Sequence, residues 1–120
     1  MSQLARLEVG SLSRLFRALG DETRVRIVAL LAHGELCVCH LESALGLTQP
    51  NCSRHLALLR AAGVVERRRD RSWVYYRLAA QPDAACRSQL RALVRAFAKQ
   101  DLLRRDVERL LAARGPGSCG

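Results

Sequence analysis

Apolar residues recur at intervals of three and four over most of the chain, and this spacing predicts a mainly helical fold. Glycine, aspartate and proline separate the apolar segments where helices are expected to end and begin. One stretch, ending in WVYYRL, alternates with a period of two and indicates strands instead. The predicted helices run from about Leu12 to Leu19, Glu22 to Ala32, Val38 to Leu45, Gln49 to Gly63 and Ala84 to Arg114.

Two of these helices are joined by a tight turn and predict a helix-turn-helix. Gly46 follows the shorter one and tolerates the positive φ at which many helices stop. Thr48 can cap the next helix, and Pro50 lies in its first turn, where a missing N–H costs no helical hydrogen bond. The second helix of such a motif lies in the major groove of DNA. Base contacts are expected from Gln49, Asn51, Ser53 and Arg54, while His55 has either a DNA contact or a packing role.

A short hairpin is predicted directly after the reading helix. Its strands are Val64–Arg69 and Ser72–Leu78, with a turn at Asp70 and arginines crowded at the tip. A basic hairpin in this position is typical of the wing of a winged helix, which contacts phosphates or a narrow minor groove. The expected backbone contacts are Arg68, Arg69 and Arg71.

The chain therefore predicts an α+β winged helix-turn-helix with three segments. Residues 1–10 form a lead-in, residues 11–114 the DNA-binding and dimerisation domain, and residues 115–120 a flexible tail. The helix Ala84–Arg114 is too long to bury its apolar stripe on so small a body. Pairing of that helix and the first helix with those of a second subunit would cover the stripe, which predicts a homodimer.

Charge strengthens the expectation of a nucleic-acid partner. The 120-residue chain has 20 Lys and Arg against 11 Asp and Glu, a formal net charge of +9. Such an excess favours a polyanion, and the polar face of the reading helix adds base-edge donors and acceptors that a purely architectural protein would not need. No apolar run spans a bilayer and no signal-peptide pattern is present, so a cytoplasmic protein without a membrane partner is expected.

Two cysteines, Cys37 and Cys39, stand at the start of the shorter helix and suggest soft-metal chemistry. Unpaired N–H groups and the helix dipole at that end favour thiolates, and thiolates select thiophilic ions. On an ideal helix two such residues point roughly 200° apart. We therefore expect that one ion held by both sulfurs unwinds the first turn and moves the short helix against the reading helix.

The segments LGDETRVRIVALLAHGELCVCHL, GLTQPNCSRHLALLRAAGVV and RSWVYYRL together resemble the ArsR/SmtB family of metal-responsive bacterial repressors. The resemblance covers about Leu12 to Leu78, and ELCVC is similar to the arsenite-sensing branch. It implies a non-enzymatic homodimeric repressor that binds an inverted-repeat operator when empty. Trivalent arsenic or antimony, as arsenite or antimonite, would bind Cys37 and Cys39 as the inducer and release the DNA, with no permanent cofactor.

The third arsenic ligand is open at this point. Well-known arsenite sensors have a third cysteine where this chain has Glu42, and the zinc-sensing branch uses His ligands that the final helix lacks. Candidates for the third ligand are Cys52, Cys86, Cys119 or a non-protein hydroxide or small thiol.

Two other functions compete with this one. Cysteines could respond to oxidant or persulfide by forming a disulfide, although residues two apart in a helix are poorly placed for that bond. An enzyme with a cysteine nucleophile would need a Cys/His/Asp set or a phosphate-binding glycine loop, and the spacing offers neither.

Overall fold

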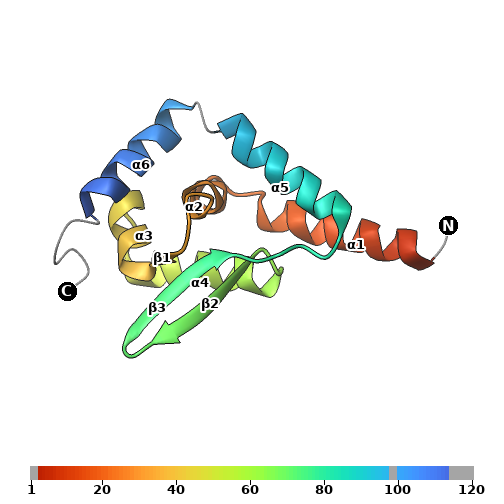
Figure 1. The fold of residues 1–120 in the computed structure, drawn as a ribbon, viewed down its shortest axis with the longest axis horizontal. Coiled ribbons are helices and arrows are strands. Elements are labelled where there is room, and N and C mark those ends of the chain that lie inside the picture. Colours follow the sequence, from red (N-terminus) through yellow and green to blue (C-terminus); the bar gives the residue numbers. More distant parts are fainter. Residues whose placement is uncertain (1–2, 98–99, 114–120) are drawn as a thin grey trace.

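The computed structural model describes residues 3–97 and 100–113, and it confirms the mainly helical fold with one β-hairpin. Helices α3 and α4 form the predicted helix-turn-helix, and strands β2 and β3 form the hairpin that projects from it (Figure 1). The elements in chain order are α1 (Gln3–Ala18), α2 (Glu22–Leu31), β1 (Leu36–Cys37), α3 (Val38–Leu45), α4 (Gln49–Ala61), β2 (Val65–Asp70), β3 (Trp73–Leu78), α5 (Ala84–Phe97) and α6 (Asp101–Ala113).

Local capping fixes the ends of the central helices as the sequence predicts. The Asp21 side chain accepts a hydrogen bond from the Arg24 amide at 3.1 Å and caps α2. Gly46 ends α3 with φ +65°, and the Thr48 hydroxyl accepts from the Asn51 amide at 3.4 Å to cap α4. Such a cap is worth about 1 kcal/mol, so these residues fix the geometry of the helix-turn-helix.

The sheet has one strand that the sequence pattern did not indicate. Its order is β1–β3–β2, with antiparallel pairing throughout. The added strand, β1, is two residues long and pairs Leu36 with Tyr76 and Cys37 with Tyr75. The hairpin is thereby joined to the segment that leads into α3.

Apolar side chains from α1 to α4 meet around α2, which lies at the centre of the view in Figure 1. Each fully buried side chain of this kind contributes about 1.5–3 kcal/mol of hydrophobic stabilisation. The core includes Leu15, Ile27, Val28, Leu30, Leu41, Leu56, Leu59 and Val64. No helix in the described part of the chain is long and apolar enough to cross a membrane.

The first helix begins earlier than expected. It starts at Gln3, inside the segment 1–10 that the pattern left as a lead-in. Leu4 and Leu7 precede Leu12 and Leu15 at helical spacing, and Gly10 is tolerated within the helix. The tail, residues 115–120, lies outside the described residues.

The single long C-terminal helix predicted from Ala84 to Arg114 is wrong. Helix α5 ends at Phe97 and α6 begins at Asp101, and α6 folds back onto α3 and α2 of the same chain (Figure 1). Leu110 is 1% exposed, so part of the apolar stripe is buried within the subunit. The surplus apolar surface that suggested this dimer contact is therefore smaller than expected.

A buried ion pair fixes α6 in this position. Asp106, which is 1% exposed, accepts a hydrogen bond from Arg26 Nε at 2.6 Å and a second one from the other arm of the guanidinium. The hydrogen bonds to Asp106 raise the pKa of Arg26 above its ordinary value. A charge buried as deeply as Asp106 is stable only when it is paired, so α2 and α6 are held in one arrangement.

Candidate nucleic-acid interface and cysteine groove

The predicted reading residues lie on the exposed side of α4. Gln49, Asn51, Ser53 and Arg54 are all exposed. Arg54 donates a hydrogen bond to Asn51 Oδ1 at 2.9 Å, which holds these two side chains together. The remaining two, Gln49 and Ser53, line a groove shared with the hairpin. Asn51 and Arg54 therefore lie outside this groove, whereas Gln49 and Ser53 line it.

His55 lies on a different side of α4 from these residues. Its Nδ1 is 3.4 Å from an Arg24 guanidinium nitrogen and 3.8 Å from Asp21 Oδ1. Asp21 itself has a pKa below its ordinary value, chiefly because the Arg24 amide donates to it. These contacts tie His55 to the start of α2 and favour its packing role over a DNA contact.

The three hairpin arginines predicted to contact the DNA backbone have different environments. Arg69 lies in β2, and Arg71 lies in the turn with φ +59°, a conformation unusual for a residue other than glycine. Arg68 is instead engaged: its Nε and one terminal nitrogen bind the Glu35 carboxylate at 2.6–3.0 Å, and its guanidinium lies 4.5 Å from the Tyr75 ring centroid. The Arg68 hydrogen bonds lower the pKa of Glu35.

Glu35 is a residue that the sequence reasoning missed. It lies two positions before Cys37, and its partner is 33 residues away in the chain. Nothing in the local pattern marks it, because the pair depends on β1 joining the hairpin. Through it, a wing arginine is attached to the segment that carries the cysteines.

The two cysteines are closer in space than the helical geometry predicted. Cys37 is the N-cap of α3 with an extended backbone (φ −72°, ψ 147°), so only Cys39 is helical. Their Sγ atoms lie 3.4 Å apart, which is longer than a covalent S–S bond of about 2.05 Å. The expectation that the sulfurs point about 200° apart is therefore wrong, because it placed both residues on one helix. The unwinding mechanism built on it loses its premise.

The sulfur pair opens onto a groove of about 290 Å³ between α3, α4 and the hairpin. The groove wall combines both cysteines, two reading residues, one acidic side chain, one basic side chain and aromatic rings. Its lining residues are Cys37, Val38, Cys39, Glu42, Gln49, Ser53, Arg67, Ser72, Trp73, Val74 and Tyr76. A ligand held by the two sulfurs would therefore border residues expected to contact DNA.

The other described cysteines, Cys52 and Cys86, are both buried in the core. Cys52 is fully buried in the core, where burial and the charge of Glu42 raise its pKa to about 12. Cys86 is 3% exposed and packs in the core from α5, and Cys119 lies outside the described residues. Within residues 3–97 and 100–113, no three His, Cys, Asp or Glu side chains gather as a metal site.

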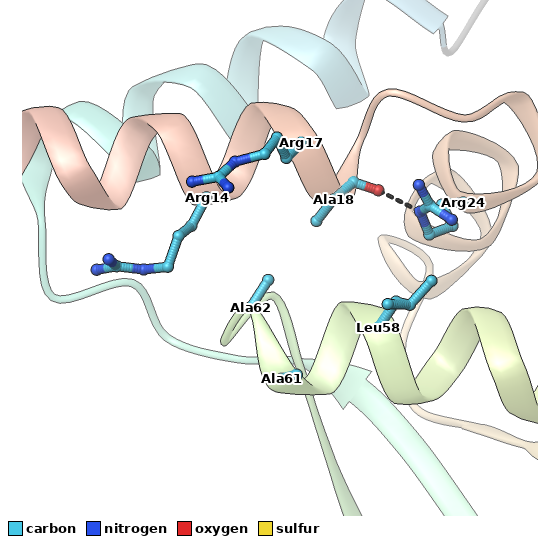
Figure 2. Close-up of a pocket in the computed structure, with 7 residues that line it drawn as sticks. All are labelled: Arg14, Arg17, Ala18, Arg24, Leu58, Ala61 and Ala62. Atoms are coloured by element: carbon cyan, nitrogen blue, oxygen red, sulfur yellow. Dashed lines mark hydrogen bonds between the residues drawn. The ribbon is translucent and has the colours of Figure 1, made fainter.

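A second pocket, of about 260 Å³, lies near the other end of α4. Figure 2 shows arginines from α1 and α2 around it, with Leu58, Ala61 and Ala62 of α4 as the opposite wall. Arg24 donates to the Ala18 carbonyl at 2.6 Å, while Arg14 and Arg17 each lie near a serine hydroxyl of their own helix. The start of α4 thus borders the two cysteine sulfurs, whereas its end borders arginine guanidinium groups.

The sequence of the chain is similar to those of known proteins. Residues 21–67 match the family model of bacterial regulatory proteins of the arsR family. The chain is 46% identical over 97 residues to the arsenic resistance transcriptional regulator ArsR1 of Pseudomonas putida, covering 80% of this chain and 74% of that one. This chain belongs to the arsR family.

Two further proteins are similar to this chain in sequence or fold. The arsenical resistance operon repressor of Escherichia coli is 56% identical over 66 residues, which cover 54% of this chain and 56% of that protein. The homodimeric winged helix-turn-helix DNA-binding domain Mb0332 of Mycobacterium bovis aligns with a TM-score of 0.65 and 30% identity, covering 85% of this chain and 91% of that one. The winged helix-turn-helix fold is confirmed.

Proposed function

We propose that this arsR-family chain is a homodimeric transcriptional repressor released from its operator when arsenite or antimonite binds Cys37 and Cys39. The observation that carries the proposal is the shared groove: both cysteines line it together with Gln49 and Ser53. Relatives named as regulators of arsenic resistance supply the expected inducer class. The DNA contacts proposed are Gln49, Asn51, Ser53 and Arg54 to bases, with Arg68, Arg69 and Arg71 to phosphates.

The sulfur geometry supports one shared ion. Two thiolates that are each about 2.3 Å from one soft ion have sulfurs at most about 4.6 Å apart. The observed separation of the Cys37 and Cys39 sulfurs is 3.4 Å. The pair therefore needs little rearrangement to bind, and the first turn of α3 stays helical.

Release then follows from what the ion borders. A trivalent ion at the groove wall places its remaining ligand beside Gln49 and Ser53. The bound ion then displaces the first turn of α4 or the hairpin from the position in which it contacts DNA. A coupling free energy of about 1–3 kcal/mol, or about 5–150-fold in affinity, suffices for such a response.

The test is fluorescence anisotropy of a labelled duplex from the DNA upstream of the chain's own coding sequence. Salt is held constant, because phosphate contacts dominate the affinity, and a phosphine serves as reductant. We expect arsenite to weaken binding by at least about fivefold for wild type and not for Cys37→Ser/Cys39→Ser. Cys86→Ala, which removes a buried cysteine on α5, is the matched control and should respond like wild type. Arsenite release that survives the double substitution would reject the site.

Homodimerisation is proposed to use α1. Val9 and Phe16 are 55% and 53% exposed. Together with Leu12 they line an open, mostly apolar pocket of about 700 Å³. The fold neighbour described as homodimeric supports a homodimer, and the exposed apolar side chains of α1 are the surface we propose for it. Phe16→Glu should shift the protein toward monomer in analytical ultracentrifugation, and an unchanged dimer would move the interface elsewhere.

A thiol-redox repressor is the second candidate, and the same distance favours it. Because Cys37 is not helical, the geometric objection to a Cys37–Cys39 disulfide is weakened. Oxidation by peroxide would form one S–S bond as two thiol protons and two electrons reduce the peroxide to water. Release by peroxide and not by arsenite in the anisotropy assay would select this function.

A further inference from the structure

We propose that the pocket between α1, α2 and the end of α4 is a second DNA contact, at which arginine side chains bind phosphates of the operator backbone. This inference rests on the proposed function, because it concerns the DNA that the repressor binds. It goes beyond that function by bringing α1 into contact with the DNA between the two half-sites.

Three guanidinium groups line this pocket, which has a volume of about 260 Å³. Arg14 extends from α1 into the space between α1 and α4 (Figure 2). Arg24 is fixed by its hydrogen bond to the Ala18 carbonyl, whereas Arg14 and Arg17 contact serine hydroxyls of their own helix at 3.4 and 3.5 Å. Among the described residues, no salt bridge includes any of these three arginines. Guanidinium groups gathered in this way favour an anionic ligand.

The pocket continues the exposed side of α4 that carries Asn51 and Arg54. Leu58 and Ala61 lie four and seven residues after Arg54, which places all three on one side of the helix, and all three are exposed. The rise from Asn51 to Ala61 is about 15 Å, close to the width of the major groove, about 12 Å. When the first turn of α4 contacts bases, the pocket therefore lies at a sugar-phosphate strand that borders the groove.

The wall opposite the arginines suits the approach of a DNA strand. It consists of Leu58, which is 49% exposed, and of the small side chains of Ala61 and Ala62. The alanines leave room for the backbone to reach the guanidinium groups, and a deoxyribose ring offers Leu58 an apolar surface.

The position of Arg17 relates this contact to the symmetry of the dimer. Arg17 also lines the pocket of Val9, Leu12 and Phe16 that we propose as the dimer contact. The two arginine pockets of a dimer would then lie on either side of its two-fold axis, so the phosphates that they bind fall between the half-sites.

The test is the salt dependence of operator binding by the full-length protein, measured by fluorescence anisotropy from about 50 to 200 mM salt. Each arginine–phosphate contact contributes about 0.9 to the slope of log affinity against log salt concentration. Arg14→Gln/Arg17→Gln removes two contacts from each subunit, so we expect the slope of the dimer to fall in magnitude by about 3.6.

The matched control is Arg105→Gln/Arg109→Gln, which removes the same charge from exposed residues of α6. It should leave the slope nearly unchanged, and circular dichroism checks that both double variants keep the wild-type fold. Equal changes of slope in the two double variants would mean that only net charge matters and would overturn the inference.

Neutral methylphosphonates locate the contact on the DNA. One phosphate at a time is replaced between the half-sites, and at a contacted position this should weaken wild-type binding by about 1.5- to 5-fold. The same replacement should not weaken binding of Arg14→Gln/Arg17→Gln any further. Equal weakening of both proteins at every position would contradict the proposed contact.

Inorganic phosphate distinguishes the DNA backbone from a small anion as the ligand. At constant ionic strength and without DNA, added phosphate should change the melting temperature of wild type and of Arg14→Gln/Arg17→Gln equally. Stabilisation that requires the two arginines, with an unchanged salt slope, would replace the DNA contact by a small-anion site. Wild-type binding with a slope that the arginine substitutions leave unchanged overturns this inference alone, whereas failure of wild type to bind the duplex overturns the proposed function.

Discussion

The two sides of α3 differ in how they are held. On one side α6 packs against it, with Leu110 fully buried and with Asp106 of the Arg26–Asp106 ion pair 1% exposed. On the other side lies the open groove. The Glu35–Arg68 ion pair, which joins the hairpin to the segment before Cys37, has side chains 25% and 51% exposed. A buried pair is expensive to break, and an exposed pair contributes at most about 1 kcal/mol.

The side of α3 that faces α6 thus contributes to the stability of the fold, and the side that faces the groove is the one where a ligand can act. The α6 side fixes α3 on the core, so the base of the cysteine site does not move. The groove side is held by contacts weak enough for a ligand to rearrange with the few kcal/mol that binding supplies. An inducer site between α3 and the hairpin can therefore act on the exposed Glu35–Arg68 contact of the hairpin.

Breaking the buried pair tests the fixed side and should give the largest effect. Asp106→Ala leaves Arg26 without its partner, and we expect a loss of about 3–5 kcal/mol in the free energy of unfolding. Urea denaturation followed by circular dichroism measures it. The double variant Arg26→Met/Asp106→Leu should recover much of the loss, because no charge is then buried alone. A single-variant loss below about 1 kcal/mol would show that α6 is not fixed by this pair.

The buried thiol of Cys52 on α4 gives a second test, which uses the pH dependence of stability. The folded-state pKa of Cys52 is raised to about 12 by burial, from an ordinary value of 9.0. Above pH 9 the unfolded chain releases this proton while the folded chain retains it, so stability should fall as pH rises from 9 toward 12. Cys52→Ala removes this contribution and should flatten the stability profile over that range. Parallel profiles for the two proteins would contradict the assignment.

The smallest expected effect lies at the exposed pair. Glu35→Gln should change the free energy of unfolding by less than about 1 kcal/mol but free Arg68 for a phosphate, tightening DNA binding by about 1.5- to 5-fold at fixed salt. Anisotropy titrations measure this change. Glu66→Gln, which removes the carboxylate paired with Arg77 at 2.5 Å on the same hairpin, is the matched control. Equal effects of both substitutions would mean that only net charge matters, and that the link to Cys37 has no role.

The parts of the fold that depend on neighbouring residues could be predicted from sequence. Asp21, Gly46 and Thr48 act within a few positions of themselves, and so α2, α3 and α4 have the expected starts and the expected turn. The second strand of the hairpin followed from the period of two over Trp73–Leu78.

The features that sequence reasoning missed are long-range. Arg26 and Asp106 are 80 residues apart, and neither has a local signal that would place α6 on α3. Strand β1 is too short to show alternation, so the extended backbone of Cys37 and the 3.4 Å sulfur separation were not expected. The geometry of Cys37 and Cys39 thus depends on tertiary pairing that no local pattern indicates.

The pairing of Cys37 with Tyr75 attaches the base of the hairpin to the cysteine site, so a movement at this site would rotate the whole hairpin. Arg71, in the turn, precedes Tyr75 by four residues, which is at most about 13 Å at about 3.3 Å per residue. A tilt of about 10° at the pivot would displace the tip by about 2 Å, enough to break a hydrogen bond to phosphate of about 2.9 Å. A rotation too small to disturb the core would thus be amplified into a loss of backbone contacts at the far end of the wing.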